Sequence, residues 1–390
     1  DIDVMTQLVL FDDGATDAAR LSPLCDLRAS FELRTGAVTT AERLSRQLAE
    51  SIAAVVVPVG LEALVSMRAN IPINAMPTGN GPFLFVNGRY PSFDLHPPHE
   101  INTADVDEYG AVIAALLDQT EAAAFIESRC TELPDAVDVE PEAGVQMLRR
   151  PWQLIEGFES LMMDDLAAMK GYAHLNCDEH PMVVKFGDFP VLVGRNVHID
   201  PMTIFKAVQG PIVLDDGAEV NAHSVIYGPC YLGRDTTLHH RSDIGRSAIG
   251  PGCKLGGEIS KCVVQGNSNK GHGGYLGYSY LGEWVNLGAA TVASNLKNTY
   301  GPVVMQGDSS ADPEDTGMQF LGTIMGDHVK TAIGTRLMTG SCIGTGAMIA
   351  LSGYAPKCVE PFAFLSDSGH QRYILEKFVL VADRMMQRRG

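Results

Sequence analysis

The feature that most constrains the fold is a short repeat in the second half of the chain. An aliphatic residue followed by glycine recurs from Val193-Gly194 to Ile343-Gly344, with shortest intervals of five to six residues. Such a period fits neither an α-helix nor a strand with alternating faces. It fits a solenoid whose coils have three flat sides, with the aliphatic residue pointing inward and the small residue at a corner. The sequence therefore predicts a left-handed parallel β-helix of about nine coils, at roughly 18 residues each.

The repeat is visible at many positions between these limits. The further steps are Leu232-Gly233, Ile244-Gly245, Ile249-Gly250, Leu276-Gly277, Leu281-Gly282, Leu287-Gly288 and Ile333-Gly334. The period breaks at 299–320, which is polar and rich in proline and glycine, and this segment is predicted as an extruded loop.

The composition along the chain predicts four segments. Strand-like runs at 8–11 and 83–86 alternate with helical spacing at 40–54 and 107–117, which predicts an α/β domain. The final run RYILEKFVLVADRMMQRR is typical of an amphipathic helix, with basic residues that suit its C-terminal dipole. The predicted segments are a nucleotidyltransferase-like α/β domain at 1–130, a helical connecting arm at 131–188, the β-helix at 189–355 and a capping helix at 356–390.

Charge and composition exclude several classes of partner. The formal net charge of −18 argues against nucleic acid or an anionic membrane surface, because both need a basic face. No apolar run reaches the roughly 20 residues that span a bilayer. The first residues have no basic segment before an apolar one, so a cytoplasmic location is expected. The eight cysteines are scattered without a CxxC pair, which predicts reduced thiols and no metal.

The stretch SNKGHGGYLG at 268–277 contains the strongest candidate for chemistry. Histidine suits a general base because its unperturbed pKa lies near neutrality. Lysines can bind phosphate, asparagines can bind hydroxyl or amide groups, and the neighbouring glycines allow a close approach to the backbone. The alternative is that the histidine is a solvated turn residue of an inert solenoid. The candidates that consecutive coils would stack on one edge are Lys270, His272, Tyr275, Asn286, Asn295 and Lys297.

Three stretches make the chain resemble the GlmU-like bacterial sugar-nucleotidyltransferase family. They are GGEISKCVVQGNSNKGHGGYLGYSYLGEWVNLGAATVASNLKNTYG, DTGMQFLGTIMGDHVKTAIGT and, near the N-terminus, LVLFDD with LSPLCDLRASFELRTG. The family is named for a bifunctional UDP-N-acetylglucosamine pyrophosphorylase and glucosamine-1-phosphate N-acetyltransferase. The resemblance implies an acetyl-CoA-dependent N-acetyltransferase in the β-helix that acts on an amino-sugar phosphate. It also implies a cytoplasmic homotrimer that makes a cell-wall precursor.

The resemblance assigns roles to individual residues. His272 takes the position of the base that accepts a proton from the sugar amine, and Tyr275 and Asn286 match positions that contact the sugar. Asn295 matches a further polar position, and Ala289 a backbone contact to the acetyl donor. Ala332 is expected on the same acetyl-CoA groove.

One position departs from the family pattern. The phosphate-binding lysine of the family lies twelve residues before the histidine, where this chain has Ser260. Lys261 is adjacent, but a shift of one residue along a strand turns the side chain to the other face. Two alternatives follow: either a local bulge lets Lys261 compensate, or the phosphate contact is weakened.

The N-terminal segment departs further from a nucleotidyltransferase. The family has a glycine-rich loop and a lysine to bind nucleotide phosphates, whereas this chain has FDDGATDAARLSPL with one glycine and Ser30 at the lysine position. FVNGRY offers Asn87 where a metal-binding aspartate is expected, so Mg²⁺ is required only if this domain is active. Pyrophosphorylase activity on UDP-sugars is therefore doubtful. The weak candidates for nucleotide binding are Asp12, Asp13, Arg20, Arg28 and Arg34.

Two competing hypotheses remain open to test. A zinc enzyme on the same solenoid needs histidines spaced about five apart, whereas His239 and His240 are adjacent and His223 is alone. A non-catalytic protein that binds a nucleotide-sugar without turnover is the second hypothesis. Its support is the degenerate phosphate loop and Ser260.

Overall fold

The computed structural model describes residues 6–14, 19–91, 96–180 and 182–388 of the chain. The chain forms two compact units. Unit 1 comprises residues 1–21 and 27–150, and unit 2 comprises residues 22–26 and 151–390. The helix of the predicted connecting arm therefore belongs to the same unit as the β-helix.

Unit 1 is an α/β domain built on a six-stranded mixed sheet with the order β2-β1-β3-β5-β4-β6. β2 and β3 flank β1 in parallel, whereas β5 runs antiparallel to β3 and β4. The strands are β1 (Gln7–Phe11), β2 (Ile52–Val56), β3 (Phe83–Asn87), β4 (Thr103–Val106), β5 (Val112–Leu117) and β6 (Asp138–Pro141). The helices are η1 (Ser30–Glu32), α1 (Thr40–Leu48), α2 (Glu62–Ser66) and α3 (Gln119–Glu127).

Both faces of this sheet are covered. Leu8 and Leu10 pack into one buried cluster, while Val9 and Phe11 pack into another. A strand that is buried on both faces reads as a continuous apolar run, which is why LVLF predicted a strand. α1 begins at Thr39, whose side chain and that of Glu42 form a reciprocal capping box.

Two segments of unit 1 differ from the sequence prediction. Residues 107–117 were predicted as a helix, but 112–117 form the buried strand β5. Its run VIAALL is apolar on both faces, and periodicity does not separate such a strand from a buried helix. The helix predicted over 40–54 ends at Leu48, and the chain continues into β2.

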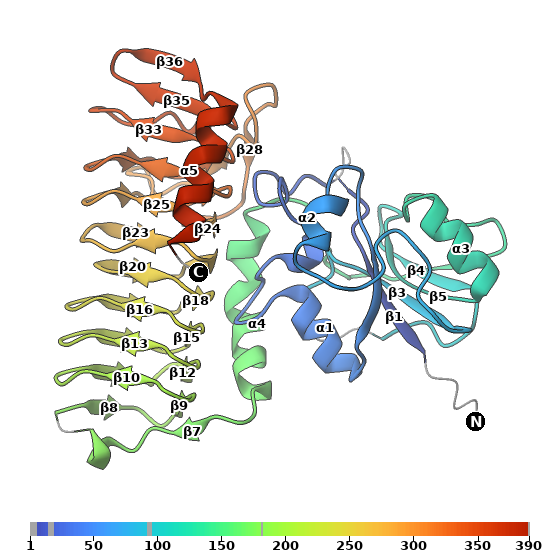
Figure 1. The fold of residues 1–390 in the computed structure, drawn as a ribbon, viewed down its shortest axis with the longest axis horizontal. Coiled ribbons are helices and arrows are strands. Elements are labelled where there is room, and N and C mark those ends of the chain that lie inside the picture. Colours follow the sequence, from blue (N-terminus) through green and yellow to red (C-terminus); the bar gives the residue numbers. More distant parts are fainter. Residues whose placement is uncertain (1–5, 15–18, 92–95, 181, 389–390) are drawn as a thin grey trace. The chain divides into compact units, whose positions relative to one another are not determined.

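Unit 2 is a parallel β-solenoid with three long sheets and a terminal helix, which confirms the predicted hexapeptide-repeat architecture (Figure 1). The first sheet contains β10 (His198–Ile199), β13 (Glu219–Val220), β16 (Thr237–Leu238), β19 (Lys254–Leu255), β22 (Asn269–Lys270), β25 (Asn286–Leu287), β30 (Lys330–Thr331), β33 (Met348–Ala350), β35 (Ala363–Ser366) and β36 (Gly369–Arg372). The second sheet contains β8 (Val184–Phe186), β11 (Ile204–Lys206), β14 (Val225–Tyr227), β17 (Asp243–Gly245), β20 (Glu258–Ser260) and β23 (Tyr275–Gly277).

The third sheet closes each coil. It contains β7 (Ala173–His174), β9 (Val191–Val193), β12 (Ile212–Leu214), β15 (Cys230–Leu232), β18 (Ala248–Ile249), β21 (Val263–Gly266), β24 (Tyr280–Glu283), β29 (Thr323–Met325), β32 (Ser341–Ile343) and β34 (Cys358–Val359). Two short strands, β26 (Val292–Ala293) and β31 (Arg336–Leu337), pair in parallel in the upper coils.

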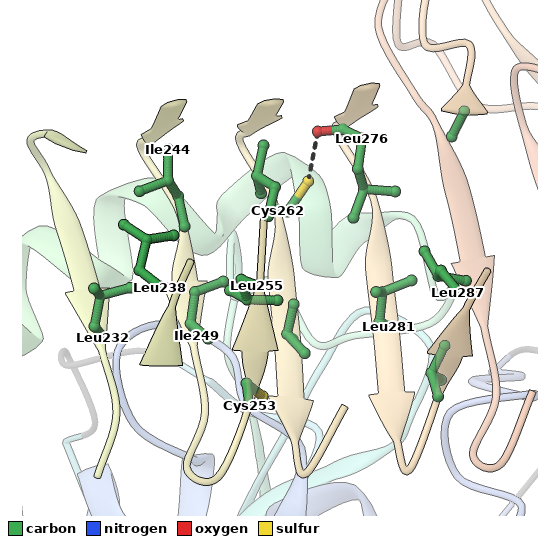
Figure 2. Close-up of a cluster of buried hydrophobic side chains, with 14 of the residues drawn as sticks. Leu232, Leu238, Ile244, Ile249, Cys253, Leu255, Cys262, Leu276, Leu281 and Leu287 are labelled. Carbon is green, nitrogen blue, oxygen red and sulfur yellow. Dashed lines mark hydrogen bonds between the residues drawn. The ribbon is translucent and has the colours of Figure 1, made fainter. Parts of the chain in front are cut away.

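The inward residues of successive coils stack into one apolar core (Figure 2). In the second sheet Ile226, Ile244 and Ile259 lie in direct register, and in the third sheet Leu232, Ile249 and Val264 do the same. One predicted inward residue is an exception. Ile333 lies at a corner between β30 and β31 and is 79% exposed, so its aliphatic-glycine step does not contribute to the core.

Three further elements complete unit 2. The predicted loop 299–320 carries a small antiparallel pair, β27 (Val304–Met305) with β28 (Glu314–Asp315). α4 (Gln153–Ala168) runs alongside the solenoid, where Glu159 accepts hydrogen bonds from Arg246 at 2.6 Å (Figure 1). No helix among the described residues is long and apolar enough to cross a membrane.

The terminal helix α5 (Leu375–Gln387) runs along the side of the upper coils (Figure 1). Phe378 packs edge-on against Phe362, with ring centroids 5.0 Å apart, and against His328 at 5.5 Å. The predicted helix is present, but the strand that pairs with the last parallel strand β35 is the antiparallel β36. β36 therefore covers the strand edge that the helix was expected to cap.

The stacked core predicts different costs for two isoleucines of the same repeat. Ile249 is fully buried, so Ile249→Ala should reduce the free energy of unfolding by about 2–5 kcal/mol through lost burial and a cavity. Ile333→Ala should change it by less than about 0.5 kcal/mol. Urea unfolding followed by circular dichroism measures both. Equal losses in the two variants would contradict the assignment of Ile333 to an exposed corner.

Candidate active site

His272 lies at the corner of the solenoid that joins β22 to β23, and its side chain is exposed. This segment, residues 271–274, is called the histidine corner below. Gly274 has φ +134°, and a Cβ atom there would lie 2.2 Å from the Thr291 carbonyl oxygen of the next coil. The coil geometry therefore requires glycine at 274. At Gly273 a Cβ atom would meet nothing within 4 Å, so open space lies beside His272.

The next coils stack their corners on the histidine corner. The Ala290 amide donates to the Gly273 carbonyl at 3.0 Å, and the Gly334 amide donates to the Ala289 carbonyl at 2.7 Å. A Cβ atom at Gly288 would lie 2.5 Å from the carbonyl carbon of Ala332, so these corners pack tightly. The structure thus brings the corners that contain Ala289 and Ala332 into one column with the histidine corner. The exposed Ile333 adds an apolar side chain to this column.

Tyr275 begins the second sheet immediately after the histidine corner. Its hydroxyl oxygen accepts a hydrogen bond from Asn295 Nδ2 at 2.9 Å, so two of the predicted substrate-binding residues are in direct contact. The phenol lies across Gly277, where a Cβ atom would be 2.1 Å from the hydroxyl oxygen. Burial raises the pKa of Tyr275 to about 12. The hydroxyl therefore stays protonated at neutral pH and can donate its hydrogen to a ligand.

Asn286 lies on the first sheet, on the other side of the histidine corner. Its Oδ1 accepts a hydrogen bond from Asn269 Nδ2 at 2.8 Å, and it is in register with Lys330 of the coil above. The Lys330 ammonium donates to the His328 carbonyl at 3.2 Å, and burial lowers the pKa of this lysine. Asn269 and Lys330 were not predicted as site residues. The loop 299–320 separates Lys330 from Asn286 in the sequence, so their pairing could not be predicted from spacing. Asn269 directly precedes Lys270, so it could have been predicted as a site residue.

A second histidine lies beside the histidine corner. His239 Nε2 is 3.3 Å from the position that a Cβ atom would occupy on Gly271. Burial is the main cause that lowers the pKa of His239, and the charges of His240, His272 and Lys254 lower it further. Its proximity arises because Gly256 and Gly271 leave room above it in the stack. The spacing in the sequence did not reveal this proximity, since one coil lies between the coil of His239 and that of His272.

Lys270 differs most from its prediction. It was expected to present its ammonium group to a phosphate beside His272, but it is in register with the core residue Leu255 and is 2% exposed. Its Nζ donates to the carbonyl oxygens of Gly256 at 2.8 Å and of His272 at 3.0 Å. Lys270 therefore points into the solenoid, because adjacent residues of a strand face opposite sides.

The structure bears on the two alternatives for Lys261, of which one required a local bulge that lets it replace the missing phosphate ligand. Ser260 pairs in regular register with Gly245 and Gly277, so no bulge moves Lys261 onto its face. Lys261 instead has φ +52° at the turn after β20. Its ammonium group pairs with Glu159 at 3.3 Å and lies 5.1 Å above the Tyr278 ring.

Lys297 lies after Asn295 at the start of the extruded loop. Its Nζ donates to the Pro302 carbonyl at 2.9 Å, and it is close enough to Lys357 to contribute to lowering the pKa of that residue. The largest cause of that lowered pKa is burial of Lys357. Among the three predicted lysines, Lys270 bonds inside the solenoid and Lys261 pairs with Glu159. Lys297 instead makes its contact within the extruded loop.

The candidate nucleotide residues of unit 1 are largely engaged within the domain. Asp12 accepts backbone hydrogen bonds from Gly14 at 2.8 Å and Ser30 at 2.6 Å, and burial raises its pKa. Asp13 accepts from Arg89 Nε at 2.8 Å and from Asn87 Nδ2 at 3.1 Å. Both carboxylates are therefore oriented by other groups.

The three predicted arginines have different environments. Arg28 is buried near Glu32. Burial raises the pKa of Glu32, and the charge of Arg28 opposes part of that shift. Arg34 is buried and donates to the Ala37 carbonyl. Arg20 is exposed. Residues 15–18, which form part of the predicted phosphate loop, lie outside the described residues.

A pocket of about 300 Å³ lies beside Asp13 in unit 1. Its lining includes Arg89, Tyr109 and Arg149, none of which was predicted from sequence. Arg149 forms an ion pair with Asp107 and lies 3.8 Å above the centre of the Tyr109 ring. Both guanidinium groups at the pocket are therefore paired with carboxylates, Arg89 with Asp13 and Arg149 with Asp107.

The carboxylates at this pocket do not fit a Mg²⁺ site. Asp12 is committed to two backbone amides, Asp13 is paired with Arg89, and the neighbouring position is the amide Asn87. Across the described residues, no group of three or more His, Cys, Asp or Glu side chains could hold a metal ion.

Comparisons with known proteins agree with the resemblance. Residues 8–171 match the family described as sugar nucleotidyl transferase. The chain is 24% identical over 185 residues to the bifunctional protein GlmU of Methanococcus aeolicus, covering 44% of this chain and 40% of the relative. It is 29% identical over 139 residues to the bifunctional protein GlmU of Methanocaldococcus jannaschii, covering 35% of this chain and 31% of the relative.

A third relative is a bifunctional sugar-1-phosphate nucleotidylyltransferase/acetyltransferase of Sulfurisphaera tokodaii. It is 28% identical over 154 residues, which is 36% of this chain and 36% of the relative. The chain thus matches less than half the length of these relatives. The predicted similarity to GlmU-like proteins is confirmed, and residues 8–171 match the sugar nucleotidyl transferase family.

The packing around Tyr275 predicts unequal effects of two alanine substitutions. Gly277→Ala places a methyl group on the Tyr275 hydroxyl, so it should break the bond to Asn295 and reduce the free energy of unfolding by about 1–3 kcal/mol. Gly273→Ala enters open space and should change it by less than about 0.5 kcal/mol. Denaturant unfolding measures both, and a cost at 273 equal to that at 277 would contradict this packing.

Burial of Lys270 predicts a pH-dependent stability. Desolvation is the main cause that lowers its pKa from 10.5 to about 8, while Cys262 and Glu258 oppose the shift. Between these values the unfolded chain binds more protons, so stability rises as pH increases from about 8 towards 10.5. The penalty below pH 8 is about 3 kcal/mol. The gain in unfolding free energy on Lys270→Leu should therefore shrink with rising pH, and a gain that is constant over this window would contradict the assignment.

Proposed function

We propose that the β-helix of this chain transfers an acetyl group from acetyl-CoA to the amine of an amino-sugar phosphate. The observation that carries this proposal is the convergence of His272, Tyr275 with Asn295, and the Ala289 and Ala332 corners on one edge of the solenoid. An exposed imidazole, polar side chains for a sugar and a groove of small residues are the parts that such a transfer needs.

In the proposed reaction the amine nitrogen attacks the carbonyl carbon of the thioester. His272 accepts the proton that the nitrogen loses as the new C–N bond forms. The C–S bond then breaks, and the proton passes to the departing sulfur, so that CoA leaves as a thiol. Tyr275 and Asn286 hold the sugar ring on either side of the histidine corner, and the orientation they impose converts a bimolecular encounter into an ordered attack.

The relatives support the substrate class. The name of the Sulfurisphaera tokodaii relative combines sugar-1-phosphate nucleotidyl transfer with acetyl transfer, and residues 8–171 of this chain match the sugar nucleotidyl transferase family. We infer that the acceptor is an amino-sugar 1-phosphate and that the chain works as a homotrimer with sites shared between neighbours. Because Lys261 is paired with Glu159, the lysines that we propose for the acceptor phosphate are Lys297 beside Asn295 and Lys330, which is in register with Asn286.

Unit 1 supports a second candidate function, which is binding of a nucleotide-sugar without turnover. The pocket lined by Arg89, Tyr109 and Arg149 offers a binding volume, whereas Asp12 and Asp13 are engaged and do not suit Mg²⁺, so nucleotidyl transfer has less support than binding. Tight binding of UDP-N-acetylglucosamine or CoA together with no acetyl transfer to any amino sugar would favour this alternative for the whole chain.

A thiol-release assay with acetyl-CoA and glucosamine-1-phosphate tests the leading proposal. His272→Ala should lower the rate of CoA release by about 10²- to 10⁴-fold, because the base is lost. The matched control is His370→Ala, an exposed histidine on the terminal strand β36, which should retain the wild-type rate. Full activity of His272→Ala, or the same loss in both variants, would contradict the role of His272.

A further inference from the structure

The inward-facing positions of the first sheet form a ladder that Lys270 interrupts. Leu238, Leu255 and Lys270 follow one another in register, and Leu287 belongs to the next coil. The three leucines belong to the apolar core, and the lysine between them is 2% exposed. Removing an ammonium group from water is costly unless hydrogen bonds compensate. A lysine at this position therefore needs a reason beyond packing.

The two acceptors of Lys270 identify that reason. Nζ donates to the Gly256 carbonyl at 2.8 Å, which belongs to the coil below, and to the His272 carbonyl at 3.0 Å. Lys270 thus links the backbone of the residue that carries the imidazole to the neighbouring coil. The contact is made from inside the solenoid, whereas the imidazole is exposed outside.

The histidine corner needs such a link because its own sequence is flexible. Three of its four residues are glycines, which restrict backbone dihedrals least. The Gly273 carbonyl accepts a hydrogen bond from the Ala290 amide at 3.0 Å, but a side chain at Gly273 would have open space around it. Without the bond to Lys270, the backbone of His272 would lose a restraint between these glycines.

We propose that Lys270 is a positioning residue that holds the His272 carbonyl and thereby fixes the direction of the imidazole at the histidine corner. This inference rests on the proposed acetyl transfer. Lys270 does not contact substrate in this role, since its amino group faces the core. Its action is to keep His272 in the orientation in which it can accept the amine proton.

Two substitutions separate positioning from structural support. Lys270→Leu restores the aliphatic ladder, and Lys270→Met retains an unbranched side chain without any N–H donor. Both variants should fold and unfold at a temperature equal to or above that of the wild type at pH 7. Both should lower kcat by about 10- to 100-fold with little change in KM for acetyl-CoA, as expected for a displaced reacting group. A wild-type kcat in either variant would overturn the proposal.

A second readout does not depend on activity. Hydrogen–deuterium exchange of the peptide amides at 271–274 should be faster in both variants than in the wild type, while exchange in the other coils should be unchanged. The control is Lys185→Leu, which removes a half-buried lysine that donates to the Gly187 carbonyl at 2.8 Å in a distant coil. This control should change neither kcat nor exchange at the histidine corner.

The outcomes distinguish this inference from the proposed function. Acetyl transfer by the wild type with unchanged kcat and exchange in Lys270→Leu would overturn the positioning role alone. Absence of transfer by the wild type would remove the proposed function, and the exchange measurement would still decide whether Lys270 restrains the histidine corner. Exchange that is equal in the wild type and both variants would overturn that restraint.

Discussion

The register in which each coil hydrogen-bonds to the next determines every feature of the candidate site. Parallel pairing places Leu255 under Lys270 and Asn269 under Asn286, so residues far apart in sequence become neighbours in columns. The same pairing sets which residues face the core, because neighbours along a strand face opposite sides. The stacked aliphatic core stabilises that register, since a slip by one residue would expose it. The chemistry of the corner therefore depends on the packing of the interior.

The sequence predicted the solenoid and its edge well because both follow from local rules. A repeat of aliphatic and small residues indicates the three-sided coil, and His272, Tyr275 and Asn295 lie close enough in sequence to occupy consecutive coils. Tyr275 and Asn295 do form a direct hydrogen bond. The predictions were wrong where one residue of register decides the outcome. Lys270 faces the core, and Ile333 faces solvent.

Other features were beyond the reach of sequence spacing. Lys330 pairs with Asn286 because the chain returns to the solenoid after the loop 299–320. The length of such a loop does not predict which residue will pair with Asn286. His239 approaches Gly271 across an intervening coil that has glycine at that point. In unit 1, Arg89 and Arg149 reach the same pocket from segments about sixty residues apart, which only tertiary structure brings together. Strand β5 was mistaken for a helix because burial on both faces removes its alternating pattern.

The central claim is that the edge around His272 moves an acetyl group from sulfur to nitrogen. The most direct measurement is ¹³C NMR of the purified chain mixed with acetyl-CoA labelled at the carbonyl carbon and with glucosamine-1-phosphate. The account predicts that the thioester carbonyl signal is replaced by an amide carbonyl signal in equal amount. A thioester signal that persists, or one replaced by free acetate, would contradict it.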